Sequence, residues 1–501
     1  MAARKLTPEA FLENQRALML AAGIAPEEAA QRLGSTVLLT VAEDDDVAAS
    51  LAAEIEMLLE RTLMVARALE PGQPCAVELV VGPAARRTEA PCVGIASDEE
   101  GCTIGPDIGR GKLVSIHPLL DLIVACYACG AALYRAVCRD MPNAPPDQLR
   151  LHYEALGIQP NLLAGPIDIG TAYMTGAGAI GNGFLWAARH VNLRGLLNVV
   201  DDDIVSSGNL QRQIWFDTDD LEKPKASRLC ARAQSRFPDL ELKPRPSRLQ
   251  DLPERGSGPW LERLIVAVDS RQARRSLQKE LPREVFDAST TGTREIVLHT
   301  NRQLSGLACM GCIYPKDQRE ISERMSMASH LGIEVADMDA DRIAPHVATK
   351  IVAKYPQLDP AAVGGMAFET LYKSLCSSQQ LQSTEGPAVV APFAFVSVLA
   401  GAMLLLEVVD ILRSGSSSSS HNDWRISPWH PPLPQKRRRR STISDCECCN
   451  HAGLRSAAQR LWGPTRPDVP SAPDSHLGSR NHSTTEDTRR WGNACTTIAP
   501  S

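Results

Sequence analysis

The segment TGAGAIGNGFLWAARH contains three glycines in the pattern Gly176-x-Gly178-x-x-Gly181. A loop of this kind between a strand and a helix lets the backbone approach a phosphate group, which the helix N-terminus then binds through its N–H groups. The pattern alone is weak evidence, because it fits a dinucleotide used for redox chemistry as well as a nucleotide used for another reaction. The residues that follow the loop must discriminate between the two.

Charged and polar residues follow the glycines in a definite order. Asp201 lies 20 residues beyond Gly181, where a nucleotide-binding βαβ unit places the acid that binds a ribose hydroxyl. Asp203 follows, and then come Asn209, Arg212, Gln213 and Lys225, of which Arg212 and Lys225 are positively charged. A triphosphate needs such cations and a dinucleotide has no evident need of them, while Asp269 can hold Mg²⁺ at the end of the next strand. Nucleotidyl transfer is therefore favoured over hydride transfer.

Two pairs of cysteines have metal-ligand spacing. Cys309 and Cys312 form one CxxC pair, and Cys446 and Cys449 form another, with Cys448 as a competing ligand. Four thiolates suit tetrahedral Zn²⁺, and such a closed shell is structural because it leaves no position for water or substrate. The alternative is that both are ordinary pairs of core thiols. A third pair, Cys126 and Cys129, lies inside an apolar segment without a partner pair, and we expect it to be core.

Apolar runs that end in acidic residues indicate the elements that position these groups. The segments 171–175, 196–205 and 264–270 read as parallel strands whose carboxyl ends carry the ligand groups. Residues 1–150 repeat this layout of strands and Ala-rich helices without its glycines, which predicts an α/β fold with a degenerate internal repeat. Two unrelated α/β domains are the alternative.

Composition limits the partners and the compartment. The net charge of −6 over 501 residues gives no reason to expect nucleic acid or a membrane surface as a partner. The N-terminal segment has no apolar stretch like that of a secretory signal, so we expect a reducing cytoplasm. The apolar segment 388–412 is long enough to span a bilayer, but Pro392, Glu407 and Asp410 favour a buried core helix. The basic run 436–440 is expected to be a solvated surface cluster.

These motifs together resemble the family of ThiF, MoeB, HesA and ubiquitin-activating adenylyltransferases. The match runs through GAGAIG, the acids of DDD, NLQRQ, KPK, the VD of AVDS, and the paired CxxC motifs. The resemblance implies that Gly176, Gly178 and Gly181 line an ATP loop and that Asp201 holds the ribose. It also implies phosphate contacts from Asn209, Arg212, Gln213 and Lys225, Mg²⁺ on Asp269, and Zn²⁺ on four cysteines.

The resemblance extends to a second chemical step and to the N-terminal half. In ubiquitin-activating relatives, a cysteine between the zinc knuckle and the final Ala-rich helix attacks the acyl adenylate, and here that interval of the chain carries Cys376. A non-catalytic Cys376 is the alternative. Ubiquitin-activating enzymes pair an active half with an inactive copy, and residues 1–150 resemble such a copy fused in cis. Arg16 is near the position where relatives carry an arginine that reaches ATP, although a solvated helix arginine is the simpler interpretation.

We therefore predict a Rossmann-like adenylation fold that is pseudo-dimeric. The expected segments are a degenerate copy (1–150), a nucleotide-binding part (151–315), an insertion with Cys376 (316–387), a helix and zinc-knuckle part (388–450) and a disordered tail (451–501). The predicted function is activation of a ubiquitin-like protein with a C-terminal glycine, in partnership with a conjugating enzyme. The layout resembles the activating enzyme of bacterial ubiquitin-like conjugation operons, some of which act against phage. A sulfur-carrier adenylyltransferase and a non-catalytic scaffold are the alternatives, and a homodimer stays open.

Overall fold

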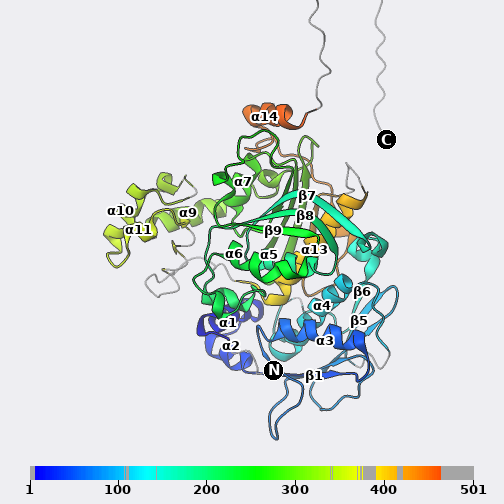
Figure 1. The fold of residues 1–501 in the computed structure, drawn as a ribbon. Helices are drawn as coiled ribbons and strands as arrows, with labels where there is room; N and C mark the ends of the chain where they lie inside the picture. Colours follow the sequence, from blue (N-terminus) through cyan, green and yellow to red (C-terminus); the bar gives the residue numbers. More distant parts are fainter. Residues whose placement is uncertain are drawn as a thin grey trace, which may run out of the picture. The chain divides into compact units, whose positions relative to one another are not determined.

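A computed structural model describes residues 6–463, except for 107, 109–111, 143, 317, 339, 341, 369–370, 373–374, 376–390 and 415–420. Within these residues the chain forms two mixed sheets, each of which begins with parallel strands and ends with antiparallel ones. Helices from both halves of the chain lie between the two sheets (Figure 1). The predicted α/β class is therefore confirmed.

The N-terminal sheet has six strands in the order β2-β1-β3-β4-β5-β6. Their bounds are β1 (Thr36–Val41), β2 (Met64–Ala66), β3 (Val77–Val81), β4 (Cys92–Ser97), β5 (Gly101–Gly105) and β6 (Leu149–His152). Its helices are α1 (Pro8–Ala22), α2 (Pro26–Leu33), α3 (Asp46–Leu59) and α4 (Pro118–Val137). Because β6 pairs with β5, this half extends slightly beyond residue 150.

The larger sheet has eight strands in the order β14-β13-β12-β11-β10-β7-β8-β9. Their bounds are β7 (Pro166–Thr175), β8 (Asn192–Val200), β9 (Leu240–Arg245), β10 (Arg263–Val266), β11 (Glu284–Thr291), β12 (Glu295–Arg302), β13 (Asp423–Ile426) and β14 (Arg437–Arg438). The helices of this half are α5 (Ala179–Ala188), α6 (Lys225–Ala233), α7 (Arg271–Lys279), α8 (Met310–Ile313) and α13 (Ala394–Ser414). Strands β7, β8 and β10 are the predicted strands, with bounds that differ by a few residues.

The two sheets share one topology, which confirms the internal repeat. Strands β1 to β6 correspond in order, direction and neighbours to β7, β8, β10, β11, β12 and β13. Helix α3 follows β1 as α5 follows β7, and α4 precedes β6 as α13 precedes β13. Since α13 packs against α4 as well as α5, equivalent helices meet at the centre of the molecule. The chain is a pseudo-dimer in cis.

Helices α4 and α13 are long and apolar enough to cross a membrane by length and composition alone. The structure buries 78% and 83% of their most apolar windows, so within this fold they are core helices. Cys126 and Cys129 on α4 are fully buried, as expected of core thiols. Helices α5 and α13 cross with their backbones in contact, because a Cβ added at Gly401 would lie 2.2 Å from the Phe184 nitrogen.

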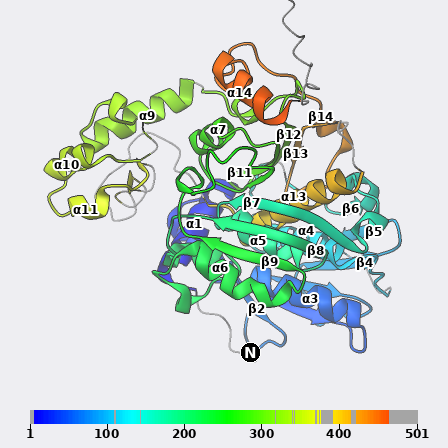
Figure 2. The ribbon, with the colours of Figure 1, turned by 45° about the horizontal axis from the view of Figure 1, so that its top comes forward.

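The insertion forms a small helical unit beside the larger sheet (Figure 2). It contains α9 (Gln318–Leu331), α10 (Pro345–Lys354) and α11 (Pro360–Val363). Buried residues such as Leu331, Val347 and Ile351 give it a core separate from those of the two sheets. Its separate core is consistent with a segment inserted into the larger half.

Two expectations about the C-terminal region are corrected. Residues 452–462, predicted as part of a disordered tail, form helix α14, which docks because Trp462 Nε1 donates to the Leu281 carbonyl at 2.8 Å. The basic run 436–440 is not simply solvated. Arg437 lies 3.8 Å above the Trp424 ring and donates to the Leu156 carbonyl at 2.7 Å, and it belongs to edge strand β14.

Candidate functional site

The glycine loop connects β7 to the N-terminus of α5. Gly176 has φ +97°, and a Cβ there would lie 2.6 Å from the Ala267 carbonyl oxygen, so only glycine fits this turn. Gly178 is the N-cap of α5 and supplies no side-chain cap. Among the described residues, no heavy atom lies within 4 Å of a Cβ built at Gly178. The N-terminus of α5 therefore has no side-chain cap and has free space beside its N-cap residue, as an anion site requires.

A buried asparagine holds this loop in shape. Asn182 Nδ2 donates to the Ala177 and Gly178 carbonyls, both at 2.9 Å. Its Oδ1 accepts from the Trp215 backbone N–H at 3.1 Å. Since Asn182 is fully buried, these bonds join the glycine loop firmly to the segment 209–216.

Asp201 lies directly after β8 and contacts the glycine loop. Its Oδ2 accepts from the Ala177 N–H at 2.6 Å and its Oδ1 from the Asp203 N–H at 2.9 Å. Burial raises the pKa of the Asp201 carboxyl from 3.8 to about 6, which the nearby Lys225 partly opposes. A carboxylate in this place accepts hydrogen bonds best when it is ionised, so it suits a ribose diol above about pH 6.

Lys225 brings a positive charge to the same edge of the sheet. Its Nζ lies 3.1 Å from Asp203 Oδ2, and its side chain is largely buried at the start of α6. The carboxylates of Asp201, Asp202 and Asp203 come within 4.8 Å of one another. Lys225 therefore neutralises part of a concentrated negative charge.

Arg212 and Asp269 approach each other across the site. Burial lowers the pKa of the Arg212 guanidinium, while the carboxylates of Glu13 and Asp269 raise it. Asp269 is exposed and follows β10, just before Ser270, which caps α7. An exposed carboxylate near a partly buried cation at the strand ends is a suitable position for a metal ion bound to phosphates.

Asn209 and Gln213 flank Arg212 but have more local surroundings. Asn209 Oδ1 accepts from the Ser206 N–H at 3.2 Å and so caps the short helix η3 (Ser207–Gln211). Gln213 is 3% exposed, and its Oε1 has no hydrogen-bond partner among the described residues. Both residues lie in the same segment as Arg212, and neither is exposed.

Arg16 lies on α1, which packs against η3. Its NH1 group is 2.9 Å from Glu13 Oε1, and its side chain is 43% exposed. Glu13 thus contacts Arg16 directly and also raises the pKa of Arg212. The N-terminal helix lies beside the candidate nucleotide site, and Arg16 itself is engaged with Glu13.

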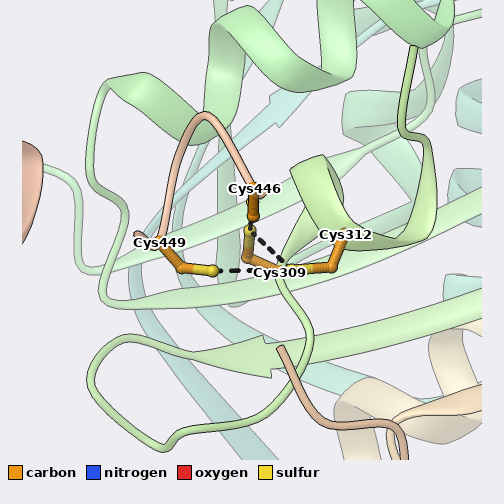
Figure 3. Close-up of side chains that lie close together, drawn as sticks. All are labelled: Cys309, Cys312, Cys446 and Cys449. Atoms are coloured by element: carbon orange, nitrogen blue, oxygen red, sulfur yellow. Dashed lines mark hydrogen bonds between the residues drawn. The ribbon is translucent and has the colours of Figure 1, made fainter. Parts of the chain in front are cut away.

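Four cysteine sulfurs converge at the end of the larger sheet (Figure 3). The Sγ atoms of Cys309, Cys312, Cys446 and Cys449 all lie within 4.8 Å of one another. Three of the Sγ–Sγ distances are 3.8 Å for Cys309–Cys312, 3.6 Å for Cys309–Cys446 and 3.5 Å for Cys312–Cys449. Tetrahedral zinc with Zn–S bonds of about 2.3 Å requires sulfurs about 3.8 Å apart. The cluster is compatible with a structural zinc ion.

The structure also distinguishes the competing cysteines. Cys449 belongs to the converging set, whereas Cys448 Sγ lies 3.8 Å from the Arg275 carbonyl oxygen, to which it donates. Hydrogen bonds with the Cys309 and Cys446 sulfurs, together with burial, raise the pKa of the Cys312 thiol. A cation is therefore needed for four thiolates to share this space.

Two arginines that the sequence did not single out join the insertion to the site. Arg275 is 2% exposed, donates to Glu320 on α9, and lies 3.4 Å from Glu447 in the cysteine loop. Arg342 forms an ion pair with Asp202, next to the candidate ribose acid. No local pattern marks either residue, because their partners are distant in sequence. Cys376, the predicted nucleophile, lies outside the described residues.

Two family models match the chain, one in each half. The ThiF family model matches residues 171–448, and the model of the E1 N-terminal domain matches residues 10–159. The first match spans more than half of the chain. The protein belongs to the ThiF family of E1-like adenylyltransferases.

Individual relatives share parts of the chain. The uncharacterized protein y4jF of Sinorhizobium fredii is 29% identical over 316 residues, which are 60% of this chain and 60% of that protein. Human ubiquitin-like modifier-activating enzyme 7 is 34% identical over 131 residues, which are 24% of this chain and 13% of that enzyme. The crystal structure of Escherichia coli MccB with ATP aligns with a TM-score of 0.34 and 15% identity, covering 71% of this chain and 97% of MccB.

Proposed function

We propose that the protein uses Mg-ATP to adenylate the C-terminal glycine of a ubiquitin-like protein and then transfers the acyl group to Cys376. The observation that carries the first step is the open N-terminus of α5 beside Asp201, Arg212 and Lys225. Family membership and the fused E1 N-terminal domain support the same reaction class. The resemblance to bacterial ubiquitin-like conjugation enzymes suggests a cytoplasmic role, including one against phage.

The adenylation step needs positioning and charge neutralisation. A carboxylate oxygen of the substrate attacks the α-phosphorus of ATP, the bond to the β-phosphate oxygen breaks, and pyrophosphate leaves. The N-terminus of α5 binds phosphate oxygens, and Lys225 and Arg212 stabilise the negative charge that builds on the leaving group. Asp201 orients the ribose, with Asn209 and Gln213 supporting Arg212. Mg²⁺, held by Asp269, would supply further charge neutralisation.

The second step is the formation of a thioester from the acyl adenylate. The Cys376 thiolate attacks the acyl carbon of the adenylate, the bond from that carbon to the AMP oxygen breaks, and AMP leaves. The thiol proton goes to solvent. A conjugating enzyme would then accept the acyl group on its own cysteine.

The test is ATP–pyrophosphate exchange with a small ubiquitin-like protein that ends in glycine. We expect exchange that depends on this protein, and a covalent band that thiols cleave. Cys376→Ala should keep the exchange and lose the band. Exchange without a band in the wild-type chain would favour a sulfur-carrier adenylyltransferase and contradict the second step.

Lys225→Ala tests the catalytic assignment. We expect exchange to fall about 1,000-fold, since removing one group that stabilises developing charge typically costs this much. Lys223→Ala is the matched control, because Lys223 is exposed and its Nζ donates to the Asp219 carbonyl at 2.6 Å. Equal exchange in the wild type and Lys225→Ala would contradict the role of Lys225, whereas cellular function that survives Lys225→Ala would favour the non-catalytic scaffold.

A further inference from the structure

Arg61 lies in the N-terminal half, just after α3, yet it binds the segment that carries Arg212. We propose that Arg61 is a positioning residue for ATP, and that the degenerate half is retained partly because it supplies this guanidinium. The inference rests on the proposed function and deepens it. It assigns a task in nucleotide binding to a residue outside the ThiF half.

The contacts of Arg61 are with backbone carbonyls of the larger half. Its NH1 group donates to the Leu210 carbonyl and its NH2 group to the Ile214 carbonyl at 2.7 Å. Both groups also lie 3.5 Å from the Phe216 carbonyl. Arg61 is 1% exposed, so these bonds form away from water, where charge-assisted hydrogen bonds are strong. The backbone from 210 to 216 therefore wraps around one guanidinium.

This arrangement fixes Arg212 from both sides. Arg212 lies between Leu210 and Ile214, whose carbonyls both accept from Arg61. A side chain on a backbone held at two nearby points loses little further freedom when it binds a ligand. Arg61 thus prepares Arg212 for phosphate without contacting the phosphate itself.

The same peptide units extend the effect to the glycine loop. The Ile214 carbonyl accepts from Arg61, while the N–H of the next residue, Trp215, donates to Asn182. Asn182 in turn binds the Ala177 and Gly178 carbonyls. One buried chain of hydrogen bonds therefore runs from the degenerate half to both phosphate-binding segments.

Helix α1 and its N-cap residue contact both the Arg61 backbone and η3. Asn14 Nδ2 donates to the Arg61 carbonyl at 2.7 Å, and Asn14 is fully buried. Thr7 Oγ1 donates to the Ser207 carbonyl at 3.2 Å. The N-terminal half therefore contacts the segment 207–216 both at its start and along its length. A ThiF half without this partner would lack these contacts.

The test measures binding of a fluorescent ATP analogue with Mg²⁺ to the full chain, together with the melting temperature. We expect Arg61→Met to weaken binding about tenfold, which corresponds to about 1.4 kcal/mol. Arg437→Met is the matched control, since Arg437 is half-buried and also donates to a carbonyl, but at the far edge of the sheet. It should lower the melting temperature and leave the affinity unchanged.

A double-mutant cycle separates positioning from general stability. If Arg61 acts through Arg212 and the glycine loop, then Arg61→Met combined with Arg212→Ala should lose less ATP affinity than the product of the two single losses. Multiplied losses in the double variant would overturn the proposal. If Arg61→Met does not fold, Arg61→Lys decides by the same cycle, because lysine keeps the positive charge and the aliphatic chain but not the planar guanidinium.

The outcomes distinguish this inference from the function on which it rests. A wild-type chain that binds no ATP would contradict the proposed function. A wild-type chain that binds ATP, with Arg61→Met or Arg61→Lys binding equally well, would contradict only the role of Arg61. Weakened binding with losses that do not multiply would support both.

Discussion

The two halves of the chain share one topology but differ at the turn after their first strand. In the ThiF half, the N-cap of α5 is Gly178, which has no side chain. In the N-terminal half, the N-cap of α3 is Asp45, whose Oδ1 accepts from the Ala48 N–H at 2.9 Å. Asp45 is 8% exposed, so this carboxylate is held at the helix N-terminus. One half leaves the anion position open, and the other fills it with an anion of its own.

This difference teaches that the repeated fold alone does not specify an open anion position. The same strand order and the same helix after the first strand occur in both halves. In the proposed function, phosphate binding depends on the residue at one N-cap and on the charges that follow. The degenerate half contributes instead through contacts with its partner, such as those of Arg61.

The largest expected effect concerns the CxxC pairs, of which the N-terminal half has one and the ThiF half has two. The two pairs of the ThiF half converge, so Cys449→Ser should reduce bound zinc below about half an equivalent and cost about 4 kcal/mol or more of stability. Cys448→Ser and Cys129→Ala should retain about one equivalent of zinc. Metal analysis and melting curves check this, and wild-type protein without zinc would exclude the four-thiolate site.

A smaller effect is expected when the ThiF half is given the cap of the other half. Gly178→Asp should weaken ATP binding about 100-fold, because a carboxylate would compete with phosphate for the same N–H groups. Gly178 has φ −77° and space for a side chain, so the fold should tolerate the change. Gly178→Ser is the neutral control for size. An unchanged ATP affinity of Gly178→Asp, measured by calorimetry, would contradict the claim that the N-cap residue distinguishes the two halves.

The pH dependence of ATP binding should follow Asp201. Its pKa of about 6 predicts that binding weakens about tenfold between pH 7 and pH 5, as the carboxylate is protonated. ATP itself titrates near this range, so Asp201→Asn gives the reference curve. The raised pKa also lowers the free energy of unfolding as the pH rises from about 4 to about 6, because the unfolded carboxyl ionises first. Identical pH profiles for the two proteins would contradict the assignment.

The smallest effect is the reciprocal change in the degenerate half. Asp45→Ala should cost about 1 kcal/mol of stability through loss of the α3 cap, and it should leave ATP affinity unchanged. Melting curves and calorimetry of the same preparation measure both quantities. A gain of a second nucleotide site in Asp45→Gly would show that the cap alone had closed this half.

Local patterns predicted the glycine loop, the strands around it and the repeat, because each depends on residues close in sequence. The similarity of the two Ala-rich helices, now α4 and α13, identified the repeat without any glycine motif in the first half. The distinction between Cys448 and Cys449 required the fold, since both have suitable spacing. The folded path of the segment 446–449 places the Cys449 sulfur beside those of Cys309, Cys312 and Cys446.

Long-range contacts account for what the sequence missed. Arg61 follows an apolar helix and would ordinarily be expected in solvent, and its carbonyl partners lie about 150 residues away along the chain. The docking of helix α14 was not predicted, because Trp462 donates to the carbonyl of Leu281, which is 181 residues away along the chain. Arg437 appeared to belong to a charged surface run because its contact with Trp424 forms only in the folded sheet.

The most direct test of the central claim is the number of ATP molecules bound per chain, measured by calorimetry with Mg²⁺. The open N-cap in one half and the filled N-cap in the other predict one site per wild-type chain. Gly178→Asp should abolish measurable binding at the same protein concentration. Two sites per chain, or one site that survives Gly178→Asp with wild-type affinity, would contradict the account.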